Sequence, residues 1–154
     1  MKIINRQVLD QLSEFARHNP RLRKNWNMHP QDNSPAHRLL NAMEPASYIR
    51  PHRHLDPNKD ETFLIVRGRL GVLLFDESGA VTGSALLDAE GETLGVDIPA
   101  GVFHTAVSLA NGTIFFEAKA GPYLPLTEEE KASWSPEDGS AAVGDYLHSL
   151  KKAL

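Results

Sequence analysis

The sequence contains no cysteine, no long hydrophobic run and no excess of positive charge. Without cysteine the chain can form neither a disulfide nor a thiolate zinc site, and it has no thiol nucleophile. No stretch approaches the roughly 20 apolar residues that a membrane-spanning helix requires. The first residues turn polar at once and show no signal-peptide core. From these absences we expect a cytoplasmic protein with no membrane partner.

The charge balance argues against a nucleic-acid partner. The chain has 16 Lys and Arg residues against 20 Asp and Glu residues, a formal net charge of -4. Nucleic-acid-binding surfaces carry a basic excess instead. One basic cluster contains Arg17, Arg21, Arg23 and Lys24. We interpret it as a solvated helix end, because cations favour the negative end of the helix dipole.

Amphipathic patterns predict a helix near each end of the chain. Residues 5–18 carry apolar side chains at the helical repeat, and Asn5 is placed to cap the first turn. The second helix is predicted from Val143, Tyr146, Leu147 and Leu150, which share one helical face. Thr127 and Glu130 also form a capping-box pattern, which predicts a short third helix.

Short apolar runs separated by turn residues fill the chain between the helices. These runs are residues 38–43, 47–54, 62–66, 71–75, 83–87, 93–98, 104–109 and 113–118. Such spacing predicts an antiparallel sandwich or barrel. Residues 25–36 are rich in Asn, Pro, Asp and Ser and are predicted to be an irregular loop. Asn111-Gly112 predicts a hairpin, since both residues tolerate positive φ.

We expect one domain with three parts. Residues 1–37 form a helix and loop that pack on the barrel, residues 38–121 form the barrel core, and residues 122–154 form an extension with a helix. The length of 154 residues suits a single domain.

Histidine and glutamate residues suggest a metal site. Residues two apart in a strand point to the same face, so His52 and His54 project together. Glu61 opens the next predicted strand, and His104 follows a tight turn at residues 99–101. Three imidazoles and one carboxylate suit a divalent ion such as iron, manganese, nickel, cobalt or zinc.

These segments resemble the two cupin motifs. The segment from His52 to Gly68 has HxH, then Glu, then six residues, then Gly, and residues 99–104 match PxGxxH. The resemblance implies a mainly β fold, the double-stranded β-helix or jelly-roll barrel, with one divalent metal ion in its mouth. It assigns the ligand roles to His52, His54, Glu61 and His104.

The sequence departs from the motifs at two places. Six residues separate His54 from Glu61, where the usual spacing is three or four, so Asp56 and Asp60 remain alternatives to Glu61. The distance from Glu61 to Gly68 favours Glu61. Ser108 stands where the second motif often ends in Asn.

A narrower resemblance covers nearly the whole chain. Residues 21–29, 48–54 and 117–123 together resemble the WbuC-type cupins, small bacterial proteins often associated with O-antigen polysaccharide gene clusters. This resemblance implies a context in surface polysaccharide metabolism but carries no defined reaction.

Five further residues are candidates for the site. His29 is a candidate acid or base and Tyr48 a candidate proton donor, although a surface histidine and a core tyrosine are the alternatives. Arg50 is expected either to hold an anionic ligand or to pair with Glu117. Glu117 and Lys119 alternate on the last predicted strand, where they either face solvent or, as the family resemblance implies, line the pocket as a polar pair. The remaining histidines, interpreted as structural or exposed, are His18, His37 and His148.

Three functions remain open from the sequence. A metal-dependent isomerase or epimerase acting on a sugar or sugar derivative is slightly favoured. The alternatives are an iron-dependent oxygenase and a non-catalytic sugar- or metabolite-binding protein. A metal-free epimerase is disfavoured by the three imidazoles. The expected partners are a small polar ligand, anionic or saccharide, and a second copy of the chain, since a homodimer would cover exposed sheet edges.

Overall fold

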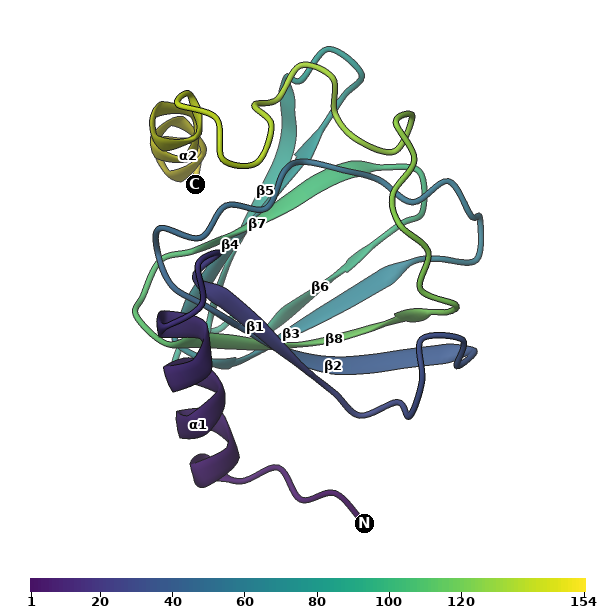
Figure 1. The fold of residues 1–154 in the computed structure, drawn as a ribbon. Coiled ribbons are helices and arrows are strands. Elements are labelled where there is room, and N and C mark those ends of the chain that lie inside the picture. The colour runs from purple at the N-terminus through teal and green to yellow at the C-terminus, as the bar shows by residue number, and fades with distance from the viewer.

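The computed structural model describes residues 1–154 and shows two antiparallel sheets facing each other (Figure 1). The larger sheet has the order β1 (Arg23–Asn27), β2 (Ala36–Met43), β8 (Thr113–Ala120), β3 (Glu61–Arg67) and β6 (Gly95–Ile98). The smaller sheet has the order β5 (Val81–Asp88), β4 (Arg69–Phe75) and β7 (Phe103–Ser108). The helices are α1 (Arg6–Arg17) and α2 (Val143–Lys152). The prediction of a mainly β jelly-roll barrel with a helix near each end is confirmed.

Strand alternation separates an inner core from two outer ones. On β8, Phe115 points between the sheets, and its neighbour Ile114 points outward to α1. The inner core fills one end of the barrel, and its buried members are Met43, Phe63, Ile65, Leu70, Val72, Leu87, Ile98, Ala106 and Phe115. Beside this core, polar side chains line a cavity that runs along β1, β2 and β8.

Each helix covers the outer face of one sheet. Asn5 caps α1 as predicted, with its Oδ1 accepting from the Val8 N–H at 3.0 Å. Leu9, Leu12 and Ala16 of α1 pack on the larger sheet, while Leu147 of α2 packs on the smaller one. Neither helix is long and apolar enough to cross a membrane.

The predicted loop at residues 25–36 is partly wrong, because β1 occupies Arg23–Asn27. This strand pairs antiparallel with β2, placing Arg23 opposite Met43 and Asn27 opposite Leu39. Its inward-facing residues are polar because they line a polar cavity inside the barrel. An apolar alternation, the usual signal of a half-buried strand, is therefore missing from the sequence.

Three local predictions also differ from the structure. The Asn111-Gly112 turn forms, but it joins β7 to β8 in different sheets and closes no hairpin. Residues 47–54 form no regular strand and make isolated bridges only, at His52. Thr127 and Glu130 make their capping contact without a helix, because the chain then pairs back onto the segment around His52.

Candidate metal centre and ligand cavity

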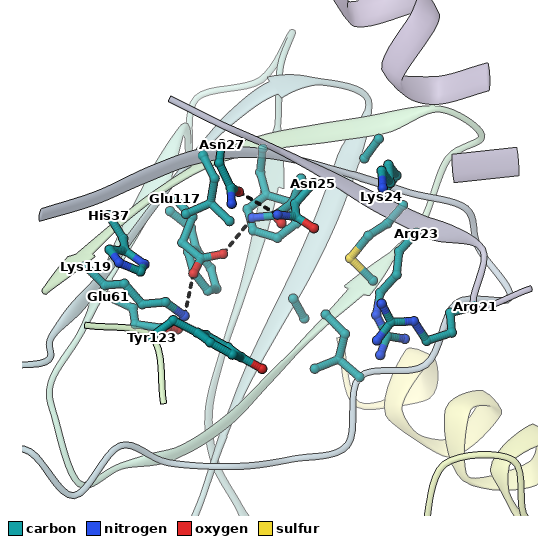
Figure 2. Close-up of a pocket in the computed structure, with 18 of the residues that line it drawn as sticks. Arg21, Arg23, Lys24, Asn25, Asn27, His37, Glu61, Glu117, Lys119 and Tyr123 are labelled. Atoms are coloured by element: carbon teal, nitrogen blue, oxygen red, sulfur yellow. Dashed lines mark hydrogen bonds and ion pairs between the residues drawn. The ribbon is translucent and has the colours of Figure 1, made fainter. Parts of the chain in front are cut away.

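A polar row across three strands marks the open end of the barrel. His37 of β2, Lys119 of β8 and Glu61 of β3 are direct cross-strand neighbours with inward-facing side chains. They line a cavity of about 430 Å³, a volume that suits a small molecule. Figure 2 shows these three side chains together at one end of the cavity.

Three imidazoles surround the Glu61 carboxylate. His54 Nε2 lies 2.9 Å from Oε1 of Glu61, and His104 Nε2 lies 3.0 Å from Oε2. Donor atoms of His52, His54 and Glu61 all lie within 4.8 Å of one another. Glu61 separates His104 from His54, whose ring centroids are 6.2 Å apart, whereas the rings of His52 and His104 are 4.7 Å apart.

The backbone brings these histidines together from distant parts of the sequence. The His52 N–H donates to the His104 carbonyl at 3.0 Å, and the His104 N–H donates back at 2.8 Å. The turn before His104 is held by the Gly101 N–H, which donates to the His54 carbonyl at 2.7 Å. Gly101 has a φ of 82°, a conformation that favours glycine.

Hydrogen bonds fix which ring nitrogens face Glu61. Nδ1 of His104 donates to the Val102 carbonyl at 2.9 Å, and Nδ1 of His52 donates to the Arg50 carbonyl at 3.0 Å. In the neutral ring, Nε2 is then an acceptor with a free lone pair. Backbone carbonyls commonly orient metal-binding histidines in this way.

Burial and charge shift the ionisation of the cluster. Burial, together with the nearby His104, lowers the pKa of His52 to about 3, so this ring is neutral at neutral pH. Burial opposes the ionisation of Glu61, but hydrogen bonds from His104 and His54 and the Lys119 ammonium hold its pKa well below the usual range. The cluster thus presents neutral His52 beside an ionised carboxylate.

The donor set fits a divalent ion. Neutral His104 would turn the lone pair of Nε2 toward a carboxylate oxygen at 3.0 Å, an unfavourable contact unless a proton or cation lies between them. Imidazole nitrogens and a carboxylate oxygen are ligands for first-row divalent metals. His52, His54, Glu61 and His104 are the residues that would hold such an ion. His104 lies outside the group of donor atoms within 4.8 Å of one another, so its separation from His54 would have to shorten on binding.

Lys119 connects the cluster to a second carboxylate. Its ammonium lies 2.5 Å from Oε1 of Glu61 and 2.6 Å from Oε1 of Glu117 (Figure 2). Burial would lower the pKa of Lys119, but the two carboxylates raise it above its usual range. Glu117 also accepts from Asn41 Nδ2 at 2.6 Å. Both residues expected to line the cavity, Glu117 and Lys119, do so.

The two acidic alternatives lie outside the cluster. Asp56 caps its own turn, with Oδ1 accepting from the Asn58 N–H at 3.0 Å. Asp60 accepts from the Ala100 N–H at 2.8 Å and so braces the turn before His104. Glu61 is 2% exposed and is the carboxylate that faces the imidazoles.

Tyr48 and Arg50 do not line the cavity, so the hypotheses that Tyr48 donates a proton there and that Arg50 holds an anionic ligand there are wrong. Tyr48 is buried and its hydroxyl donates to the Pro136 carbonyl at 2.9 Å. Arg50 donates to Ser135 Oγ at 3.2 Å and to the Ala132 carbonyl at 3.0 Å, and it does not pair with Glu117. The segment is irregular before His52, so the two-residue alternation of a strand does not extend back to these positions.

Two further histidines stand at the cavity. His29 and His37 stack with ring centroids 3.9 Å apart, and both are buried and line the cavity. His29 Nδ1 lies 3.2 Å from both the backbone nitrogen and the carbonyl oxygen of Arg38. Burial, followed by the neighbouring His29, lowers the pKa of His37. The interpretation of His37 as merely structural or exposed missed its place beside Lys119.

Strand β1 lines the cavity as well, which the sequence pattern did not indicate. Its side chains there include Asn25 and Asn27, which are hydrogen-bonded to each other. Arg21, Arg23 and Lys24, interpreted as a solvated helix end, border the same cavity. The available signal in the sequence was an alternation that involves polar rather than apolar residues. It can be recognised as a strand only when a polar cavity is known to lie beside it.

Solved structures share this barrel. KdgF from Halomonas sp. matches with a TM-score of 0.52 at 15% identity, over 67% of this chain and 82% of that one. TT1209 from Thermus thermophilus matches with a TM-score of 0.53 at 21% identity, over 78% and 97%. An oxalate oxidase in complex with the substrate analogue glycolate matches with a TM-score of 0.51 at 16% identity, over 67% and 52%. Identities this low establish the fold alone.

The barrel and its inward-facing histidines and glutamate define a cupin-fold protein with a possible metal site. The chain belongs to the family described as "Domain of unknown function (DUF6016)", whose model matches residues 4–87. No curated protein matches the chain.

Proposed function

We propose that this protein is a metal-dependent enzyme that isomerises or epimerises a small polar molecule of the sugar type in the barrel cavity. The observation that carries the proposal is Glu61, an almost fully buried carboxylate with His54 and His104 on its two oxygens and the cavity beside it. A buried acid with shifted ionisation in a cavity is a recurrent feature of active sites.

The chain's own residues provide positioning and proton transfer. His52, His54, Glu61 and His104 would hold a divalent ion, which would supply Lewis-acid polarisation of a carbonyl or hydroxyl pair. Glu117 is the carboxylate that exchanges a proton with the substrate, because it faces the cavity and is oriented by Asn41 and Lys119.

His29 is a second proton-transfer residue in this proposal. It lines the cavity, and its Nδ1 lies against the backbone of Arg38, so Nε2 is the ring nitrogen left for a ligand. His37, stacked on it, joins His29 to the row that contains Lys119 and Glu61.

The biological context in this proposal is bacterial surface polysaccharide metabolism. It follows from the resemblance of residues 21–29, 48–54 and 117–123 to the WbuC-type cupins. All three segments contribute residues to the cavity, among them Arg23, His52 and Glu117.

The proposal is tested by incubating metal-loaded protein with free sugars, sugar phosphates and nucleotide sugars and following them by NMR. Turnover that is lost in Glu117→Gln, with metal content unchanged, supports it. Binding without turnover across the panel contradicts it and favours a binding protein. Substrate-dependent oxygen consumption in the iron-loaded protein would instead indicate an oxygenase.

A further inference from the structure

The cavity has a second charged end, far from the histidine cluster. Arg23 of β1 pairs with Met43 of β2, and Met43 is six residues along β2 from His37. Six residues of strand span about 20 Å. Figure 2 shows Arg21 and Arg23 at the end of the cavity opposite Glu61 and Lys119. Both arginines and Lys24 line the cavity wall.

Positive charge at this end is not matched by carboxylates. Asp138 is the one carboxylate within ion-pair distance of Arg23, at 3.8 Å, and its side chain is 59% exposed. Arg21 and Lys24 form no ion pair, whereas Lys119 at the opposite end contacts two carboxylates. Three cations against one exposed acid leave an excess of two positive charges.

The side chains of Arg21 and Arg23 lie next to each other at this end of the cavity (Figure 2). The Arg23 side chain is 21% exposed, and burial followed by the positive charge of Arg21 lowers its pKa. Like charges in a partly buried place are unfavourable without a counter-ion.

The backbone fixes both arginines in place. Leu22, between them, has a φ of 54°, which is uncommon for a residue other than glycine. The Leu22 carbonyl accepts from the Glu44 N–H at 2.9 Å, and the Arg21 carbonyl accepts from Ser47 Oγ at 2.8 Å. The guanidinium of Arg23 also donates to the Tyr48 carbonyl. The backbone at both positions and the Arg23 side chain are thus held in place, while the exposed Arg21 side chain makes no hydrogen bond or ion pair and remains available to a ligand.

We propose that Arg21 and Arg23, with Lys24 at the rim, bind the phosphate group of a phosphorylated ligand whose polar end reaches the His52–Glu61–His104 end of the cavity. A phosphate monoester carries about -1.5 to -2 charges at pH 7, which matches the excess, whereas a single carboxylate does not. Guanidinium groups bind phosphate oxygens through paired charge-assisted hydrogen bonds. Only one part of the inference rests on the proposed function, namely that the other end of the ligand reacts at the histidine cluster.

The test is calorimetric titration of the full chain with inorganic phosphate at constant ionic strength, in chelator-treated and in metal-loaded protein. Arg21→Gln should weaken phosphate binding at least about tenfold, because one of two bidentate partners is lost. Arg6→Gln, an equal charge change on exposed α1, should leave binding unchanged. Acetate should bind more weakly than phosphate to the unmodified protein.

Arg23→Gln is a second variant. If Arg23→Gln fails to fold, Arg21→Gln still tests the inference, because the Arg21 side chain contacts no other segment that the fold depends on. Phosphate binding that is unchanged in Arg21→Gln, or absent from the unmodified protein, overturns the inference. Phosphate binding that persists in chelator-treated protein, together with no uptake of metal, keeps the inference and removes the proposed function. Phosphate binding that requires metal and is unchanged in Arg21→Gln overturns the inference and keeps the proposed function.

Discussion

His104 and Glu61 face each other from opposite sheets of the barrel, with Nε2 of the imidazole 3.0 Å from Oε2 of the carboxylate. Because Nδ1 of His104 already donates to the Val102 carbonyl, the contact requires either an imidazolium or a cation. The two solutions lead to different chemistry at the same site. An imidazolium would make the cluster a structural polar network, whereas a cation would make it a metal centre.

The acidic ligand is predicted to be Glu61. Glu61→Gln keeps the side-chain shape but removes the charge, so cobalt(II) affinity should fall by at least about 100-fold, more than loss of an outer hydrogen-bond partner costs. Calorimetric titration of tag-free protein measures this. Asp56→Asn and Asp60→Asn are the matched controls and should retain the affinity, because neither carboxylate contacts the imidazoles. A larger loss of cobalt(II) affinity in Asp56→Asn or Asp60→Asn than in Glu61→Gln would identify that aspartate as the acidic ligand instead.

Lys119 is predicted to stabilise the metal-free fold. Lys119→Met leaves Glu61 and Glu117 without their shared ammonium, so the free energy of unfolding should drop by about 2 kcal/mol. Urea denaturation measures the change. Lys131→Met removes only an exposed ion pair with Glu128 and should cost less than about 1 kcal/mol. Equal losses of unfolding free energy in Lys119→Met and Lys131→Met would show that the buried network stabilises the fold no more than an exposed ion pair does.

The two faces of α1 should differ in their effect on stability. Leu12 is 5% exposed against the larger sheet, and Leu12→Ala should lower the free energy of unfolding by about 2–4 kcal/mol. Phe15, on the same helix, is 65% exposed, and Phe15→Ala should change it by less than about 0.5 kcal/mol. A large loss in Phe15→Ala would mean that the helix covers the sheet with another face or that Phe15 lies in an interface.

Acid should destabilise the metal-free protein through His52. The pKa of this ring is about 3 in the folded protein against an ordinary value of 6.5 in an unfolded chain, so between these values the unfolded state binds the extra proton. Stability should therefore fall as pH drops below 6.5, by up to about 1.4 kcal/mol per pH unit from this group, and the loss should level off below pH 3.

Glu61 adds to the same trend at the acid end, because its pKa is lowered in the folded state and its contribution is lost as pH falls below 4.5. Between about pH 7 and pH 5, the slope from urea denaturation of chelator-treated protein reports on His52 together with His37, whose pKa is also lowered, and His52→Gln should reduce this slope. An unchanged slope in His52→Gln would show that this ring is charged in the folded protein.

The sequence predicted the parts of the fold that depend on apolar alternation or capping. Both terminal helices and the strands now labelled β2 to β8 were expected near their observed positions, because their buried faces are apolar. β1 was missed for the opposite reason, since Arg23, Asn25 and Asn27 face a polar cavity. The Asn111-Gly112 turn was foreseen, but local turn chemistry cannot tell whether the next strand continues in the same sheet.

The site was predictable where a motif fixed both residue type and spacing. His52, His54, Glu61 and His104 were singled out in this way, and the three imidazoles lie around the one carboxylate in the structure. Tyr48 and Arg50 were assigned by extending a strand that the backbone does not form. His37 and the Arg21–Arg23 pair come to the cavity only through the pairing of β1, β2 and β8, which is a long-range property of the fold.

The central claim is that one divalent ion binds among the three imidazoles and Glu61. Elemental analysis of tag-free protein, before and after incubation with divalent metals and removal of excess, tests it directly. Metal binding at this site predicts about one equivalent of a transition metal per chain in the unmodified protein and a large loss of that metal in His104→Ala. A metal content near zero after reconstitution, or full retention in His104→Ala, would contradict it.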